Sequence, residues 1–402
     1  MPDGKTKADD VPDPALAAFE LSARLVLAGR YEEALTATDE AARLYRERST
    51  DTWTGPLEAL GAAASRAYVL VFRCEALSKL GRWEECLRTA SEAVALSRSQ
   101  QADAPFAAPL GATLMGLATA LWGLGRPQEA LAMARESVGL YRRLARRDAA
   151  YRPQLANALN LLGVVLSRLG LHVEALKVTK ESVALYRRLT SADPAAHTLG
   201  LARAVNNLAR RRSVRDHGRR ALRSAREAVA LYRQLARDDP AVHRRDVAMA
   251  LGNLARAHSS REASLAAAQE SVAILRDLDQ GDPRVHGALL ADALSLLAAA
   301  LADLGRLREA AEVTTQALAM MREQAAINPV ARRGDLALAL AFHARVRAEA
   351  GTDLAEGLAA ATEAVGLMRE LAAELPQMYA SSLAEVRALE DRLRALAPPS
   401  GA

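Results

Sequence analysis

A short helical motif recurs eight times along this chain, and that repetition limits the possible folds more than any other feature. The motif reads EAVALYR in one copy and ESVALYR, QALAMMR or EAVGLMR in others. Its central apolar residue returns at intervals of 43 to 52 residues, at Leu44, Leu96, Leu140, Leu185, Leu231, Ile274, Met320 and Leu367. Such a period is typical of a solenoid, in which each unit buries its apolar face only against its neighbours. We therefore predict eight units of about 46 residues rather than the two or three globular domains that 402 residues would suggest.

Each unit contains two helical patterns separated by a turn. In the fourth unit, leucines recur in steps of three and four residues, as on one apolar helical stripe, at Leu155, Leu159, Leu162, Leu166 and Leu169. Gly170 ends this helix, because glycine readily adopts positive φ, and a second helix runs to about Thr190. Asp193-Pro194 then opens the next unit, since Asp caps a helix and Pro fits its first turn. No long stretch alternates with period two, so we predict an all-α fold.

Small residues occupy matched places in the two helices of most units. They lie 12 residues apart across the turn, as in Ser22 with Ala34, Cys74 with Cys86, Ala118 with Ala130, Gly163 with Ala175, Ala209 with Ala221, and Ala298 with Ala310. In the fourth unit Leu162-Gly163, Gly170, Ala175 and Ser182 have the spacing of the tetratricopeptide repeat, which the chain resembles over roughly residues 13–375. The period is longer than the usual 34 residues, and it resembles that of arrays in bacterial signalling proteins. HEAT-like helical repeats do not explain the glycine and alanine spacing.

The resemblance implies an α-solenoid, a right-handed superhelix of eight tetratricopeptide-like repeats. The boundaries fall at about 13–50, 56–100, 105–148, 151–192, 194–238, 240–281, 283–327 and 329–375. A C-terminal helix over 376–397 should cap the open end of the core, and residues 1–12 and 398–402 should form tails. Units five and eight are irregular, because Arg212 and Arg347 stand where an apolar residue is expected.

Two sets of residues that could suggest metal or redox chemistry have simpler structural interpretations. His197, His243 and His286 lie 46 and 43 residues apart, in one column of the repeat. Equivalent residues of neighbouring repeats are about 10 Å apart, whereas zinc bonds are about 2 Å long, so we predict no metal site. Cys74 and Cys86 occupy a pair of small positions and should pack rather than react.

Several functional classes lack sequence support. The chain has no GxxxxGK[ST] loop, GxSxG elbow or HExxH helix, so we predict a protein without a cofactor that is not an enzyme. It has no apolar run of about 18 residues and no signal-like N-terminus, which predicts a cytoplasmic protein with no membrane partner.

Charged residues also follow the repeat. An Arg follows the motif in every unit, as at Arg187 and Arg233, and a Glu precedes it in seven of the eight, as at Glu181 and Glu227. Because this pattern is so regular, we interpret it as a structural contact within or between repeats rather than a binding surface.

The resemblance also indicates where a ligand would bind. In tetratricopeptide proteins the first helices line a concave groove, and the aligned groove positions include Val164 and Met249 besides the candidates that we select here. The candidate partner-binding residues are Asn157, Asn160, Arg168, Arg203, Asn206, Arg210, Arg256 and Arg345. Asn at these positions resembles the family's clamps on an extended peptide backbone, and Arg resembles its carboxylate-binding variants. The chemistry agrees, because an amide both donates and accepts hydrogen bonds and a guanidinium binds a carboxylate through two of them.

The fifth unit is unusually basic. Nine arginines lie between Arg203 and Arg226, opposed by little besides Asp216. However, 48 of the 53 basic residues in the chain are Arg, so codon bias explains part of this excess. We expect a scaffold or sensor that binds an extended, acidic peptide or protein segment. A small-molecule receptor or enzyme using the superhelix interior is one alternative, and a nucleic-acid binder acting through the fifth unit is another.

Overall fold

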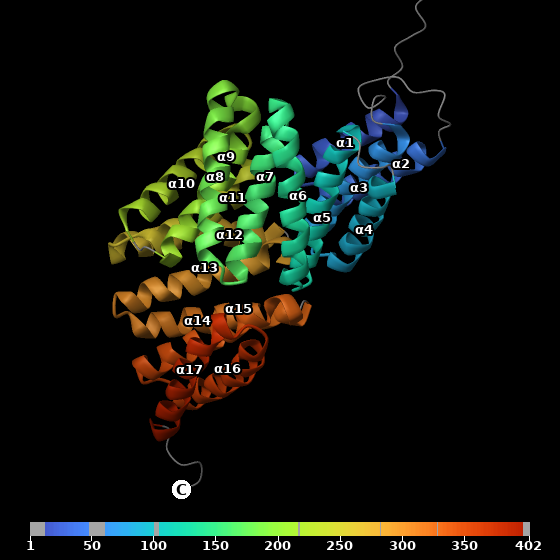
Figure 1. Cartoon of the computed structure of the whole chain (residues 1–402). Coiled ribbons are helices and arrows are strands. Elements are labelled where there is room, and N and C mark those ends of the chain that lie inside the picture. The colour runs from blue at the N-terminus through green and yellow to red at the C-terminus, as the bar shows by residue number, and fades with distance from the viewer. Residues whose placement is uncertain are drawn as a thin grey trace, which may run out of the picture. The chain divides into compact units, whose positions relative to one another are not determined.

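The computed structural model describes residues 13–47, 61–99, 104–215, 218–281, 283–327 and 329–396. Within these ranges it contains seventeen α-helices, one short 3₁₀ turn and no strand (Figure 1). The prediction of an all-α fold is therefore confirmed. The tails predicted at 1–12 and 398–402 lie outside the described residues.

The helices follow one another along the chain in pairs joined by short turns. Their bounds are α1 Pro14–Leu27, α2 Tyr31–Glu47, α3 Gly61–Lys79, α4 Trp83–Ser99, α5 Ala104–Gly123, α6 Pro127–Arg147, α7 Arg152–Arg168, α8 His172–Ala192, α9 Pro194–Arg215, α10 Arg219–Asp238, α11 Pro240–Ala257, α12 Arg261–Gly281, α13 Pro283–Asp303, α14 Leu307–Ile327, α15 Pro329–Ala350, α16 Leu354–Glu374 and α17 Pro376–Leu396. We call the odd-numbered members of these pairs first helices and the even-numbered members second helices. Seven of the described pairs lie within the predicted repeat ranges, α5 begins one residue before its range, and α17 lies within the range predicted for a terminal helix; the repeat boundaries stay a prediction.

The chain packs as two compact units, residues 1–120 and 121–402. In the first unit, Cys74 and Cys86 are free, buried thiols at the contact between α3 and α4. Their sulfur atoms lie 3.5 Å and 3.4 Å from each other's backbone oxygen, so both helices approach closely at these small side chains. The predicted packing role of the two cysteines is confirmed. The hydrogen bond with Cys86 and burial both raise the pKa of the Cys74 thiol.

In the second unit, the first helices stack on one another and the second helices cover them. Contacts join α7 to α9, α9 to α11, and α11 to α13, while each first helix also packs on its own second helix. Serines in a recurring small position help to hold the pairs together. The hydroxyl of Ser182 donates to the carbonyl of Ala156 at 2.7 Å, and that of Ser271 donates to Ala248 at 2.8 Å.

The turn and cap signals behave largely as predicted. Six turn glycines have positive φ, at Gly29, Gly81, Gly125, Gly170, Gly305 and Gly351. Asp239 caps α11 by accepting from the amide of Val242 at 3.2 Å, and Asp193 accepts from Ala196 at 3.0 Å. The corresponding caps at positions 282 and 328 lie outside the described residues.

The repeated Arg and Glu columns link neighbouring second helices. Ion pairs join Arg142 to Glu181 at 2.7 Å, Arg187 to Glu227 at 2.9 Å, Arg233 to Glu270 at 2.6 Å, and Arg322 to Glu363 at 2.5 Å. In these four repeats the Arg contacts the Glu of the following pair, and Arg276 bonds Gln316 at the same position, which supports a structural role between repeats. These pairs are largely exposed, so each contributes less than about 1 kcal/mol to stability.

The two irregular arginines are accommodated in different ways. Arg347 is buried, and its guanidinium bonds His343 at 2.9 Å, Asp353 at 2.6 Å and Glu356 at 2.8 Å. Burial and the nearby Arg347 lower the pKa of His343, which keeps the ring neutral as an acceptor. Arg212 instead donates to Ser224 at 2.6 Å and to the carbonyl of Arg220 at 3.2 Å. No carboxylate among the described residues pairs with Arg212.

One helical segment among the described residues is long and apolar enough to cross a membrane by length and composition. It is His286–Asp303 on α13, with a mean hydropathy of 1.3 and half of the segment buried. Asp292 lies in its middle, and α13 packs between α12 and α14. These contacts are those of a core helix in a solenoid.

Candidate functional site

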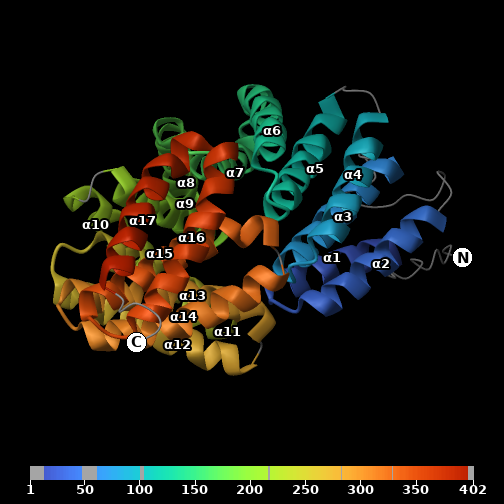
Figure 2. The ribbon, with the colours of Figure 1, turned by 90° about the horizontal axis from the view of Figure 1, so that it is seen from below.

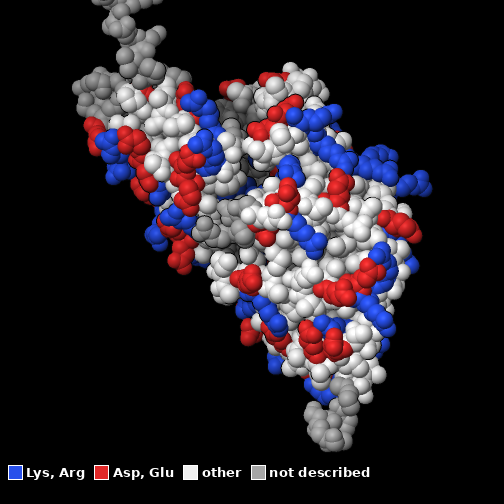
Figure 3. All heavy atoms as spheres, turned by 180° about the vertical axis from the view of Figure 1, so that it is seen from behind, with Lys and Arg blue, Asp and Glu red and all other residues white. Residues whose placement is uncertain are grey.

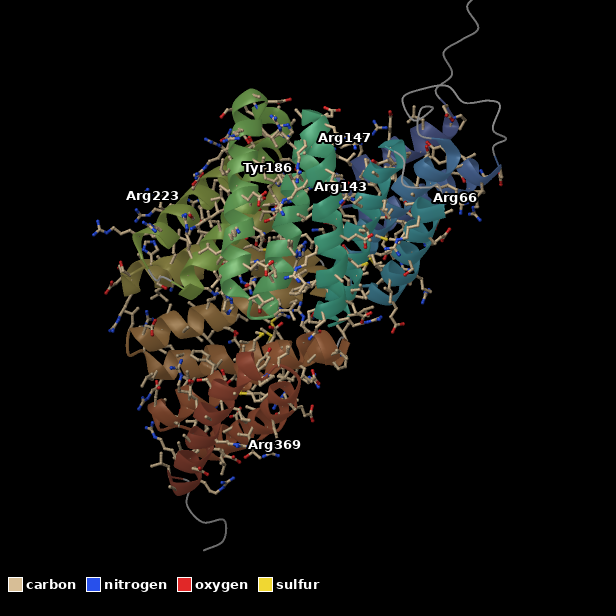
Figure 4. All side chains as sticks on the ribbon, in the orientation of Figure 1. Arg66, Arg143, Arg147, Tyr186, Arg223 and Arg369 are labelled. Carbon is tan, nitrogen blue, oxygen red and sulfur yellow. The ribbon has the colours of Figure 1, made fainter. Side chains whose placement is uncertain are left out.

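The predicted asparagines lie on the first helices, and their side-chain oxygens are already engaged. The hydroxyl of Tyr186, labelled in Figure 4, donates to Asn157 Oδ1 at 2.9 Å. Asn160 Oδ1 accepts from Asn207 at 3.0 Å, and Asn206 Oδ1 accepts from Asn253 at 2.8 Å. The last two bonds each connect a first helix to the next one, so they form a short amide ladder across α7, α9 and α11.

This ladder changes what the asparagines can offer a ligand. Asn206 is 8% exposed, whereas Asn157 is exposed and Asn160 is partly buried. Because each Oδ1 accepts a protein hydrogen bond, the amide nitrogen of each side chain remains as the group suited to a ligand carbonyl. Truncating Asn206 would also break a contact between repeats.

The predicted arginines remain accessible. Arg203, Arg210, Arg256 and Arg345 all have exposed side chains. Protein nevertheless surrounds Arg256 closely enough that desolvation, with a contribution from Arg210, lowers the pKa of its guanidinium to about 10. Arg345 lies over the ring of Phe342, with 5.1 Å from its Cζ to the ring centroid.

An acidic residue that the sequence reasoning did not select lies among these arginines. Asp292 of α13 is partly buried. Desolvation raises the pKa of its carboxyl, and the nearby Asp335 raises it further, while Arg332, Arg256 and Arg210 act in the opposite direction. Charged groups from α9, α11, α13 and α15 therefore lie within electrostatic range of one another.

Arg168 joins this group from the opposite end of the second unit. Its guanidinium lies 3.1 Å from Asp335 of α15, and its Cζ lies 5.0 Å from the ring centroid of Trp122. Next to it, a Cβ atom built on Gly170 would lie only 3.0 Å from Met378 Cγ of α17. The C-terminal end of α7 therefore contacts α15 and α17, far along the chain (Figure 1; Figure 2).

Two ion pairs of Asp335, with Arg168 and Arg332, and these electrostatic influences link six residues that we call the inner charge cluster. Its members are Arg168, Arg210, Arg256, Asp292, Arg332 and Asp335. Four arginines face two aspartates, so the cluster has an excess of positive charge. It can hold an anionic group between guanidinium groups and offer a carboxylate to a cationic group nearby.

Comparisons with known proteins agree with this architecture. Residues 110–148 and 155–195 match the sequence profile described as a tetratricopeptide repeat. These two segments match tetratricopeptide repeats, and the chain as a whole has a tetratricopeptide-like fold. No curated protein matches its sequence.

Solved structures with the same fold cover almost the whole array. A Rap protein complexed with competence and sporulation factor has a TM-score of 0.52, with 11% identity over 95% of this chain and 99% of its own. The apo form of the quorum sensor NprR from B. thuringiensis has a TM-score of 0.52, with 12% identity over 96% and 99% of the two chains. The apo form of RapI has a TM-score of 0.51, with 10% identity over 95% and 98%.

Asp292 occupies a repeat position that holds a predicted site residue in two other repeats. Its place in α13 corresponds to Arg203 in α9 and Asn157 in α7, six residues before the small position of each first helix. The seventh repeat contributed no residue to the predicted site, so this position was missed. Asp335 and Arg332 lie three and six residues before the first aligned position of α15, and only the ion pairs of Asp335 with Arg168 and Arg332 identify them.

Of the eight predicted site residues, Arg168, Arg210 and Arg256 belong to the inner charge cluster. Burial raises the pKa of the Tyr186 hydroxyl to about 12, and the charge of Arg203 partly opposes this shift. Arg203 therefore lies near Tyr186. Arg345 has no described interaction with the cluster. Within the described ranges no three His, Cys, Asp or Glu side chains are grouped so that they could hold a metal ion.

Proposed function

We propose that the first helices of the second unit bind an extended segment of a partner protein or a peptide, without catalysing a reaction on it. The contact surface would run along α7, α9, α11, α13 and α15, as a groove with the inner charge cluster at its centre. Arg203, Arg210 and Arg256 carry the proposal, because they present exposed guanidinium groups on the neighbouring first helices α9 and α11.

The chemistry of the exposed groups favours an acidic ligand. Arg203, Arg210 and Arg256 present three guanidinium groups on two neighbouring helices, while the asparagine amides remain as donors for a peptide backbone. Asp292 and Asp335 add a negative region on α13 and α15, suited to a Lys, an Arg or a free N-terminus of the same ligand. The proposed ligand is therefore acidic overall and carries at least one cationic group.

Similar structures support a recognition role. One is a Rap protein bound to competence and sporulation factor, and another is the quorum sensor NprR. We infer that this chain likewise acts as a sensor or adaptor in the bacterial cytoplasm, without a cofactor.

The test uses a phage-displayed library of random decapeptides presented to the full chain. We expect enrichment of peptides rich in Asp and Glu, and the enriched sequences are then synthesised and titrated by calorimetry. The decisive variant is Arg203→Ala with Arg210→Ala and Arg256→Ala, because these side chains are exposed and their removal leaves the amide ladder intact. It should weaken binding at least tenfold, since each charge-assisted bond contributes about 1.5–3 kcal/mol.

The matched control removes three exposed arginines from an outer helix, with Arg219→Ala, Arg223→Ala and Arg226→Ala. This variant changes the net charge equally and should bind the selected peptides within about twofold of the unmodified chain. Equal binding by the inner-face variant and the unmodified chain would place the peptide site elsewhere. Failure to enrich any peptide would argue against the proposal as a whole.

A further inference from the structure

Helix α10 carries a line of arginines on its outer surface that is separate from the inner charge cluster. Arg219, Arg223, Arg226, Arg233 and Arg237 are all exposed. Their spacing of i, i+4, i+7, i+14 and i+18 places them on one side of the helix, over a length of about 27 Å. We call these five residues the α10 arginine stripe. In Figure 3, Lys and Arg gather along the edge that α10 forms, and Figure 4 shows Arg223 pointing away from the ribbon.

The other repeats provide an internal comparison. Seven of the eight second helices have a glutamate in the first turn, including Glu84 of α4, Glu129 of α6, Glu174 of α8 and Glu309 of α14. In α10 the first turn has no acid and instead begins with Arg219 and Arg220. Cations at a helix N-terminus are unfavourable, because the macrodipole is positive there. The α10 arginine stripe thus departs from the pattern that stabilises the rest of the array.

Most of these charges have no ion-pair partner within the part of the chain that the structure describes. Arg233 pairs with Glu270, and Glu227 of α10 pairs with Arg187 of α8. No described carboxylate forms an ion pair with Arg219, Arg223, Arg226 or Arg237. Burial, Arg220 and Arg187 lower the pKa of the neighbouring Arg212, and Arg223 of the stripe adds to this effect, while Glu227 opposes it.

The composition of the surface distinguishes between two kinds of anionic partner. Stable protein interfaces depend on buried apolar or aromatic anchors within a polar rim. None of the large apolar side chains that are exposed on described residues belongs to α10. A nucleic acid requires no such anchor, because phosphate contacts and counterion release alone supply its sequence-independent binding. A length of 27 Å also matches about eight successive phosphates of one strand, at 3.4 Å per step.

We propose that the α10 arginine stripe binds the phosphate backbone of nucleic acid without reading its sequence. The site lies on a second helix, whereas the proposed peptide site lies on first helices, and it does not depend on that function. Four arginines of the stripe have no ion-pair partner among the described residues, and they provide four phosphate contacts. Such a surface would hold the array near nucleic acid while the inner face remained available to its own ligand.

The experiment measures retention of a fluorescein-labelled 20-base-pair duplex of random sequence by the full chain at several salt concentrations. With four contacts the logarithm of the affinity should fall with a slope of about −3.6 against the logarithm of salt concentration. This corresponds to a loss of roughly 150-fold between about 50 and 200 mM salt. The triple variant Arg219→Ala, Arg223→Ala, Arg226→Ala should retain one contact, so that its loss over the same range is roughly fourfold.

Two further triple variants serve as controls. Arg308→Ala, Arg369→Ala and Arg387→Ala remove three exposed arginines from α14, α16 and α17, and this control should behave as the unmodified chain does. The inner-face variant with Arg203, Arg210 and Arg256 changed to Ala should also retain duplex binding while losing peptide binding. The proposal fails if the duplex is not retained, or if the control triple loses binding as much as the α10 triple. It also fails if polyglutamate binds through α10 and the duplex does not, since the partner would then be an acidic protein.

Discussion

The consecutive helix pairs α7–α8 and α9–α10 follow one template, but they place charge differently. Positions 46 residues apart correspond, so the buried Val165 and Leu166 of α7 are replaced in α9 by Arg211 and Arg212. Arg211 is only 5% exposed, and its Nε has no hydrogen-bond partner among the described residues. Burial lowers the pKa of its guanidinium to about 10. One pair is therefore held by apolar packing, whereas the next contains desolvated charge in the same places.

The difference continues on the outer surface. Glu174 in the first turn of α8 pairs with Arg135, while the corresponding residue of α10 is Arg220. Local departures of this kind cost stability, and proteins retain them chiefly at functional sites. Comparing repeats within one chain thus separates charge that supports the fold from charge available to a partner.

The largest effect is expected from the close approach of α7 and α8 at Gly163. A Cβ atom there would lie 2.5 Å from Thr179 Oγ1. Gly163→Ala should therefore lower the free energy of unfolding by about 1–3 kcal/mol, as overpacking typically does. Thermal or urea denaturation followed by circular dichroism measures this change.

The matched control for this substitution comes from comparison with the fifth helix pair, α9–α10. There the corresponding residues are Ala209 and Ala225, so the added methyl group on one helix coincides with a smaller side chain on the other. Adding Thr179→Ala to Gly163→Ala should recover part of the lost stability, because the two residues are in contact and their effects are not additive. If the double variant is as unstable as the sum of the two single variants, steric crowding is not the cause.

The second prediction concerns the desolvated charge in α9. Arg211→Met keeps an unbranched side chain in place and removes the buried guanidinium, whose Nε has no partner among the described residues, so it should stabilise the protein by about 1–2 kcal/mol. Arg203→Met, on the exposed side of the same helix, should change stability by less than about 0.5 kcal/mol. A lower melting temperature for Arg211→Met would show that the guanidinium has a native partner that stabilises it.

The periodic features of the chain could be predicted from the sequence, because each depends on local chemistry that recurs. Turn glycines, small residues at the helix contacts and the Arg–Glu columns all appear several times. A pattern that recurs at the same place in each repeat is not a chance feature, so its structural role can be predicted. The paired thiols of Cys74 and Cys86 follow the same rule and were predicted correctly as packing groups. The predicted array of eight repeats is consistent with the observed helix pairs, while its exact boundaries stay a prediction.

The candidate site was only partly predictable, because it depends on contacts between distant repeats. Arg168 and Asp335 are 167 residues apart and meet through the curvature of the array, which no local pattern encodes. The amide ladder was also missed, since the sequence does not show that Asn206 bonds Asn253 rather than a ligand. In the sequence the arginines of the fifth repeat form one basic cluster. Only the structure separates those of α9 from the α10 arginine stripe.

A smaller effect is expected from exchanging the first-turn charges of α8 and α10. Arg220→Glu places an acid at the N-terminus of α10 and should stabilise it by about 0.5–1 kcal/mol at low salt. Glu174→Arg should destabilise α8 by a similar amount, because it also removes the pair with Arg135. Both effects should shrink in about 1 M salt. Persistence of the full effect at high salt would contradict an electrostatic cause.

The smallest effect concerns Asp292, which in α13 takes the position of Arg203 in α9. Burial and Asp335 raise the pKa of Asp292 above its ordinary value of 3.8, so the folded state binds its proton more tightly than the unfolded state does. Below that ordinary value the carboxyl is neutral in both states and contributes nothing. As pH rises through the folded pKa, a charge forms in a desolvated place, and the unmodified protein becomes less stable relative to an uncharged variant.

Asp292→Asn should therefore match the unmodified protein in melting temperature near pH 3.5 and exceed it at pH 7. The gain should be small, because Arg332, Arg256 and Arg210 partly offset the desolvation of the carboxylate. Asp391→Asn, on the exposed surface of α17, should show no such increase between the two pH values. If Asp292→Asn instead melts at a lower temperature than the unmodified protein at pH 7, attraction to the arginines outweighs desolvation. Asp292 would then be a stabilising member of the inner charge cluster rather than a charge held ready for a cationic group of the ligand.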